Sequence, residues 1–142
     1  MTGFASCPAR EFDAEQLLNH VVDSTDDAIM VESRDGTITS WNPGAERLYG
    51  YTAEEAIGRP SEMLAPPVRA GENQLLLRRV LLGASIDRLE TERLRKDGEL
   101  IAVSMTMSPV RDANGWILAA AVIARDITER RQYEERLSYL SD

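Results

Sequence analysis

The fold of this chain is decided by the stretch RDGTITSWNPGAERLYGYT, residues 34–52. Asp35 and Gly36 lie between two short runs with strand character, and this pair favours a tight hairpin turn because glycine tolerates positive φ. Asn42 followed by Pro43 is typical of a helix start, because asparagine caps free N–H groups and proline fits the first turn. The stretch therefore predicts a β-hairpin that leads directly into a helix.

Helix and strand patterns continue on both sides of this stretch. Before it, apolar residues recur at helical spacing and predict a short amphipathic helix. After it, prolines break the chain into short segments, and alternating apolar and polar residues then predict strands joined by glycine-containing turns. The predicted elements are a helix over 13–24, strands over 28–33 and 37–41, helices over 42–50, 52–58 and 72–82, strands over 86–95, 100–110 and 116–125, and a helix over 128–142. This order predicts an α+β fold with helices on one face of an antiparallel sheet.

The length and charge of the chain limit the classes of function. With 142 residues it fits one domain with short extensions. Its formal net charge of -8 disfavours nucleic acid and direct contact with an anionic membrane, since both are negatively charged. The single cysteine, Cys7, cannot form an internal disulfide, which suits a reducing compartment. We find no signal-peptide pattern and no apolar run long enough to span a bilayer, so we expect a cytoplasmic protein.

We expect four segments along the chain. They are an irregular N-terminal tail over 1–12, a flanking helix over 13–24, a core over 25–127 and an outgoing helix over 128–142. Asp126 and Glu129 have the spacing of a capping box, in which two side chains satisfy free N–H groups at a helix start. The core is therefore expected to pass directly from its last strand into the outgoing helix.

Both terminal helices carry apolar residues on one face. An isolated helix of this length is marginal in water, so such a face needs a partner surface. In the outgoing helix, a spacing of four and then three residues is typical of a coiled-coil seam. The expected interface residues are Leu17, Leu18 and Val21 in the flanking helix and Tyr133, Leu137 and Leu140 in the outgoing helix. We therefore expect a homodimer.

Several short motifs, taken together and in this order, resemble the PAS family. In the first half they are DGTI at 35–38, WNPGA at 41–45, LYGYT at 48–52 and EEAIG at 54–58. In the second half they are RKDG at 95–98, SPVRD at 108–112 and RDITER at 125–130. The resemblance covers roughly residues 15–130, and the ordered set is far more specific than any one motif.

The resemblance implies a five-stranded antiparallel sheet in the spatial order 2-1-5-4-3. Helices between the second and third strands would cover one face and enclose a pocket, through which members of the family sense ligands, light, oxygen or redox state. It also implies that Asp126, Ile127 and Thr128 mark the point where the last strand passes a signal to the outgoing helix. We therefore expect a non-catalytic sensory module of a bacterial signalling protein, joined to a downstream effector domain. That effector would be a diguanylate cyclase or a histidine kinase.

The usual cofactors of such sensors lack their attachment residues in this chain. His20 is the single histidine and lies in the flanking helix, so histidine-ligated haem is not expected. In the resemblance to light-sensing members, Ser61 takes the place of a reactive cysteine, and its oxygen is too poor a nucleophile for an FMN adduct. The positions of their flavin-binding polar side chains fall at Val103 and Ala124. We expect no metal centre, and a redox or light sensor with another bound flavin or haem stays open as an alternative.

The expected interior is apolar and lies between the inner sheet face and the helices. Strand alternation and the resemblance place there Ile29, Val31, Met63, Leu64, Leu75, Leu76, Val103, Met105, Met107, Leu118, Ala120, Val122 and Ala124. Two interpretations stay open. The interior is either a filled core, which would make the chain a ligand-free dimerisation scaffold, or a pocket for a small apolar ligand such as a fatty acyl chain.

Overall fold

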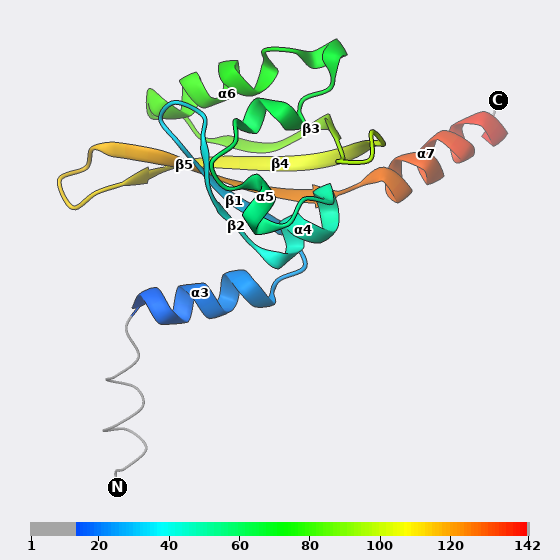
Figure 1. The fold of residues 1–142 in the computed structure, drawn as a ribbon. Helices are drawn as coiled ribbons and strands as arrows, with labels where there is room; N and C mark the ends of the chain where they lie inside the picture. Colours follow the sequence, from blue (N-terminus) through cyan, green and yellow to red (C-terminus); the bar gives the residue numbers. More distant parts are fainter. Residues whose placement is uncertain (1–13, 142) are drawn as a thin grey trace, which may run out of the picture.

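One antiparallel sheet of five strands forms the centre of the structure (Figure 1). The computed structural model describes residues 14–141, so the predicted tail over 1–12 and Cys7 lie outside the described residues. The strands are β1 Ala28–Ser33, β2 Ile38–Trp41, β3 Ile86–Leu94, β4 Leu100–Arg111 and β5 Ile117–Asp126. Their order is β2-β1-β5-β4-β3, and each neighbouring pair is antiparallel. The predicted fold class and strand order are confirmed.

Segments between β2 and β3 cover one face of this sheet, whereas the terminal helices lie outside that layer (Figure 1). The covering segments are α4 Pro43–Tyr49, α5 Ala53–Ala56, the 3-10 turns η1 Ser61–Leu64 and η2 Pro67–Arg69, and α6 Glu72–Leu81. The terminal helices are α3 Ala14–Ser24 and α7 Thr128–Ser141. In Figure 1, α7 projects away from the end of β5, so the last strand passes almost directly into the outgoing helix.

The side chain of Asn42 ties three elements together where the hairpin meets α4. Its Oδ1 accepts hydrogen bonds from the backbone N–H groups of Ala45 and Ile29, both at 2.8 Å. Its Nδ2 donates to the carbonyl oxygens of Val22 at 2.8 Å and Asp27 at 3.0 Å. Asn42 therefore caps α4 as predicted and also holds the end of α3 and the start of β1.

Glycine is required near the start of α4. A Cβ atom at Gly44 would lie 2.2 Å from the carbonyl oxygen of Asp27, well inside van der Waals contact. At the other end of the helix, Gly50 adopts the left-handed conformation with φ 87°, which ends α4 as the sequence predicted. The close approach at Gly44 sets the distance between α4 and the sheet.

The inner face of β1 differs from the prediction. Ala28, Met30 and Glu32 are buried, whereas Ile29 and Val31 lie on the other face and are half-buried. The assignment of Ile29 and Val31 to the interior is therefore wrong. The larger branched side chains favoured the wrong face, because a glutamate is rarely buried without a partner and its partners come from distant segments.

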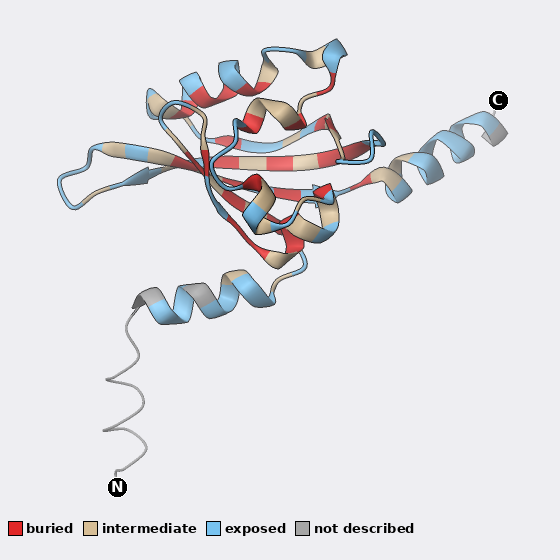
Figure 2. Cartoon of the chain, viewed as in Figure 1, coloured by how far each residue is buried: buried red, intermediate tan, exposed pale blue. Residues whose placement is uncertain are grey.

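Two leucines assigned to the interior are exposed instead. Leu118 is 52% exposed, because the β4–β5 hairpin extends beyond the helical layer at this end of the strand (Figure 2). Leu75 is 58% exposed, because α6 turns a different set of residues toward the sheet, namely Asn73, Leu76, Leu77 and Val80. Both errors arise from applying a local repeat where the covering layer ends or where a polar residue occupies the buried face.

Candidate functional site

Three polar residues from separate segments meet in the interior, and we call Glu32, Ser61 and Asn73 the polar cluster. Their side chains are almost completely buried, with exposed fractions of 0%, 2% and 3%. The Ser61 hydroxyl donates to Glu32 Oε1 at 2.8 Å, and Asn73 Nδ2 lies 3.3 Å from the same oxygen. Asn73 Nδ2 also donates to Ser61 Oγ at 2.6 Å. The strand β1, the turn η1 and the helix α6 are thus joined by polar contacts.

The carboxylate of Glu32 is only partly satisfied by these contacts. Its second oxygen, Oε2, is buried and has no hydrogen-bond partner among the described residues. Burial raises the pKa of Glu32, although the hydrogen bonds from Ser61 and Asn73 and the positive charge of Arg93 act in the opposite direction. Glu32 therefore holds a proton more readily than an exposed glutamate does.

A second polar group lies on β3 under the start of α6. Arg93 is buried, and its Nη1 lies 2.7 Å from Glu72 Oε1, which also accepts from the Thr91 hydroxyl at 2.8 Å. Partial burial alone would raise the pKa of Glu72, but the bonds from Arg93 and Thr91 outweigh it and lower that pKa. The Nη2 atom of Arg93 has no partner within the described part of the chain. The interior is therefore substantially polar on this side.

A pocket opens at the surface beside the polar cluster, between the β1–β2 turn, η1 and α6. We call it the α6 pocket, and its volume is ≈ 290 Å³. Its lining residues are Arg34, Asp35, Gly36, Pro60, Ser61, Glu62, Asn73, Gln74, Leu77, Arg78 and Leu81. Since Ser61, Asn73 and Leu77 are buried while Arg34 and Arg78 are exposed, the pocket runs from a charged rim to a mainly polar buried end.

Most of the predicted apolar set is buried, but the α6 pocket contains none of it. Buried members are Leu64, Leu76, Val103, Met105, Met107, Ala120, Val122 and Ala124, and Met63 is partly buried against them. Of this set, Ala124 borders a different pocket at the end of β5. Sequence reasoning singled out Ser61 but missed Glu32 and Asn73. The one local signal for Glu32 was a charged residue directly after four apolar residues of the same strand.

The joint between β5 and α7 is formed by Asp126, Ile127 and Thr128, the residues expected to transmit a signal. Asp126 Oδ1 accepts from the N–H of Thr128 at 2.8 Å, so the bond is a local turn rather than the predicted capping box with Glu129. Ile127 is buried, and its N–H donates to the carbonyl oxygen of Ala102 on β4 at 2.9 Å. The Thr128 hydroxyl accepts from the Ala102 N–H at 3.0 Å. The first residues of α7 are thus fixed to β4.

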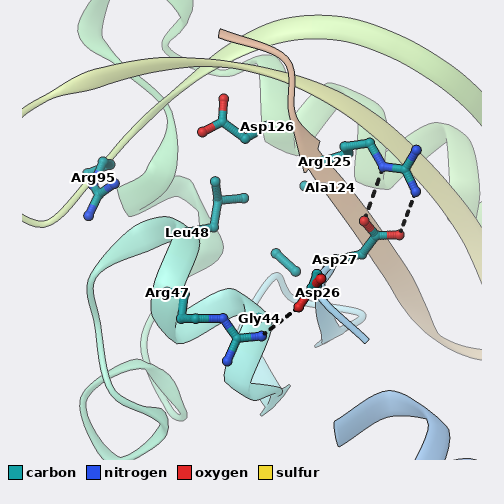
Figure 3. A pocket seen from close by; sticks show the side chains of 10 residues that line it. Asp26, Asp27, Gly44, Arg47, Leu48, Arg95, Ala124, Arg125 and Asp126 are labelled. Atoms are coloured by element: carbon teal, nitrogen blue, oxygen red, sulfur yellow. Dashed lines mark hydrogen bonds and ion pairs between the residues drawn. The ribbon is translucent and has the colours of Figure 1, made fainter. Parts of the chain in front are cut away.

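A second pocket lies beside this joint, between α4 and the ends of β1 and β5 (Figure 3). Its volume is ≈ 460 Å³, and charged side chains dominate its lining. Arg125 pairs with Asp27 at 3.2 Å, and Arg47 pairs with Asp26 at 3.6 Å. The Nε atom of Arg95 is buried without a hydrogen-bond partner among the described residues. Solvent screens the exposed pairs, so they add little stability to the joint.

The residues expected at a dimer interface are exposed in the single chain. Leu17, Leu18 and Val21 lie on α3, and Tyr133 and Leu137 lie on α7. The backbone of Leu140 belongs to α7, but its side chain lies outside the described part. His20 is exposed on α3, outside the sheet and its covering layer.

Residues 14–141 contain no group of three or more His, Cys, Asp or Glu side chains placed to hold a metal ion. None of the helices in this range combines the length and the apolar character needed to cross a bilayer.

The curated relatives that match this region of the chain include two signalling proteins of Escherichia coli. The signal transduction histidine-protein kinase AtoS of Escherichia coli strain K12 is 27% identical over 118 residues, covering 83% of this chain and 19% of that protein. The protein named "Probable diguanylate cyclase DgcE" from the same strain is 26% identical over 131 residues, covering 90% of this chain and 12% of that protein. The chain therefore spans less than a fifth of the length of either relative.

A solved structure and a family model agree with the observed sheet. The PAS domain of a Colwellia psychrerythraea protein superposes with a TM-score of 0.75 at 32% identity, covering 82% of this chain and 99% of that one. The family model described as the PAS fold matches residues 22–132, from the end of α3 to the first turns of α7. The chain therefore belongs to the PAS-fold family.

Proposed function

We propose that the chain is a cytoplasmic sensory and dimerisation module that relays a signal through α7 to an effector domain in the same parent chain. One observation carries the proposal. The helix α7 begins directly after the last strand, and Ile127 and Thr128 fix its start to β4. A change in the sheet would therefore alter the position of the helix that leaves the domain.

The comparisons support the effector part of this proposal. One relative is named as a histidine kinase and another as a diguanylate cyclase, and the chain matches only a small part of each. We propose an effector of one of these two classes, with the module itself acting without catalysis. The net charge of -8 supports a module that binds neither nucleic acid nor an anionic membrane.

The dimer part of the proposal rests on the terminal helices. Tyr133 and Leu137 are four residues apart on α7, and both are exposed although α7 is otherwise strongly charged. On α3, Leu17 and Val21 share the same spacing and are also exposed. Pairing with a second copy would remove both apolar faces from water, which is the main driving force for such association.

Sedimentation of a charge-bearing variant tests the dimer. We expect the wild-type chain to sediment as a dimer and Leu137→Asp to weaken association at least about tenfold, because a carboxylate would be buried in an apolar seam. Gln132→Asp adds the same charge beside the seam and is the matched control. Equal association constants for the Leu137→Asp and wild-type chains would refute dimerisation through α7.

A ligand-free scaffold is a second candidate function. The tight burial of Val103, Met105 and Met107 favours it, because a packed interior leaves no space for an apolar guest. We also propose that neither an FMN adduct nor histidine-ligated haem is present, since Ser61 Oγ already bonds Glu32 and His20 is exposed on α3. An absorption spectrum of the purified chain, with mass spectrometry of an organic extract, separates these cases. A visible band would support the alternative of a redox or light sensor with another bound flavin or haem, and a co-purifying molecule would refute the ligand-free scaffold.

A further inference from the structure

Two buried carboxylate oxygens near the α6 pocket have no hydrogen-bond partner within residues 14–141. Glu32 Oε2 lies in the polar cluster. Glu62 belongs to the pocket lining, and its Oε1 is also buried. The other oxygen of Glu62 accepts from the N–H of Gly71 at 2.8 Å. Burial is the main cause of the raised pKa of Glu32, and the negative charge of Glu62 adds to it. The two carboxylates are therefore close enough to repel each other.

Unsatisfied buried acceptors of this kind are uncommon and need an explanation. Native proteins pair the great majority of buried polar atoms, and an exception often marks a functional site or an absent water or ion. Here both acceptors belong to carboxylates. A partner that donates hydrogen bonds and carries positive charge would therefore satisfy a free acceptor and also neutralise negative charge.

The α6 pocket adjoins these acceptors. Ser61 and Asn73 lie at its buried end, and both bond Glu32, which is not itself part of the lining. Pro60 and Leu77 supply apolar wall. At ≈ 290 Å³ the pocket matches the lower end of the usual size of small-molecule sites. It therefore has room for a small organic molecule.

We propose that the α6 pocket binds a small organic molecule through a protonated amine. The amine lies at the buried end against Glu62 and the Ser61–Asn73 pair, with the negative charge of Glu32 behind it. An ammonium group has three donors and no acceptor, which complements acceptors that lack partners. The exposed guanidinium groups of Arg34 and Arg78 favour a hydroxyl or carboxylate at the outer end of the ligand. Amino alcohols and amino acids have this arrangement. The inference rests on the proposed sensory function, because it names the class of signal that the module would detect.

Three probes of nearly equal size and different charge test the proposal. Ethanolamine is cationic, ethylene glycol is neutral and glycolate is anionic at neutral pH. Each is titrated into the full 142-residue chain while the NMR signals of Ser61, Asn73 and the Asn73 side-chain amide are followed. We expect saturable shifts with ethanolamine and at least about tenfold weaker binding of the other two, because only the amine makes charge-assisted bonds at the buried end.

Charge-removing variants assign the binding to the two carboxylates. We expect Glu32→Gln and Glu62→Gln each to weaken ethanolamine binding about tenfold, since a glutamine keeps an acceptor but loses the charge. Glu54→Gln, on the exposed surface of α5, is the matched control and should bind as the wild-type chain does. Glu62→Gln tests the site independently if Glu32→Gln perturbs folding.

Several results would overturn the inference. These are equal shifts with glycolate and ethanolamine, no shift with any probe, or unchanged ethanolamine affinity in both glutamine variants. Equal shifts of the same signals with Mg²⁺ would assign the acceptors to a metal ion instead. The proposed relay is judged separately, because dimerisation through Leu137 does not depend on the α6 pocket. Binding with unchanged α7 and unchanged association would count against the relay and leave this site in place.

Discussion

The centre of the inner sheet face differs in chemistry from the strands on either side of it. On β4 and β5 the buried residues are apolar, as at Met105, Met107 and Val122. On the neighbouring strands β1 and β3 the interior contains Glu32 and Arg93, each with one buried atom that lacks a partner among the described residues. Apolar packing on β4 and β5 therefore stabilises the fold. The flanking strands β1 and β3 retain polar atoms that could form hydrogen bonds with a ligand.

The largest expected effect is in the apolar centre. Met107→Ala removes a fully buried side chain that lies between Ile86 and Val122 in the sheet register, and should lower the free energy of unfolding by about 2–5 kcal/mol. Urea denaturation measures the change. Leu118→Ala, on the exposed end of β5, is the control and should change stability by less than about 0.5 kcal/mol. Similar losses of unfolding free energy in both variants would contradict the difference between the packed centre and the exposed hairpin.

The second effect is in the polar group on β3. Arg93→Met keeps the aliphatic part of the side chain but leaves Glu72 without its closest cation, which should cost about 1–3 kcal/mol. We expect a smaller loss than in the centre, because Glu72 still contacts Arg69 at 3.3 Å and reaches solvent. Arg136→Met, on the exposed surface of α7, is the control for the same urea measurement. A gain in stability would mean that burying the ion pair costs more than the pair contributes.

The third effect depends on pH and concerns Glu32. Burial raises its folded-state pKa above the ordinary value of 4.5. At pH values between the ordinary and the raised pKa, the folded chain therefore binds more protons than the unfolded chain. The wild-type chain loses stability through this group as pH rises above 4.5, and Glu32→Gln does not. At pH 7 the variant should be more stable by on the order of 1 kcal/mol.

Chemical denaturation of both chains at acidic and neutral pH measures this difference. The stability gap should close as pH falls below the ordinary pKa of 4.5, because Glu32 is then protonated in both states. Glu54→Gln, which changes an exposed glutamate, should show no such pH-dependent gap. A gap of the same size at both pH values would show that the buried charge is not its cause.

The smallest effect is expected where α7 meets the edge of the sheet. Arg130 on α7 contacts Glu90 on β3 at 2.6 Å, and both side chains are about half exposed. The hydrogen bond from Arg130 lowers the pKa of Glu90, but solvent screens an exposed pair. Glu90→Gln should lower the melting temperature slightly at low salt and not at high salt. A loss that persists at high salt would mean that this contact fixes α7 more firmly than its exposure suggests.

Features whose physics is local could be predicted from the sequence. The helix starts at Asn42 and Thr52 were predicted and are present, because each depends on capping contacts between residues a few positions apart. The buried positions on β4 were also predicted from alternation, as at Met105 and Met107. In these places the local pattern and the final environment agree.

The polar cluster could not be predicted in the same way. Glu32 bonds Ser61 and Asn73, which lie 29 and 41 residues further along the chain. Only the folded arrangement brings these partners together and makes burial of a carboxylate tolerable. The inner face of β1 was misassigned for the same reason, because the charge that argued for exposure is satisfied by segments that sequence patterns do not connect to it.

The outgoing helix α7 is attached to β4 at its start, so a small tilt at this attachment would move the far end of the helix by a larger distance. Its pivot is the pair of backbone groups of Ala102 that bond Ile127 and Thr128. The helix extends about 20 Å from Thr128 to Ser141, at about 1.5 Å per residue. A tilt of about 10° at the pivot would move the far end by roughly 3 Å. A displacement too small to disturb the packing of the sheet would thus be magnified at the end of the helix.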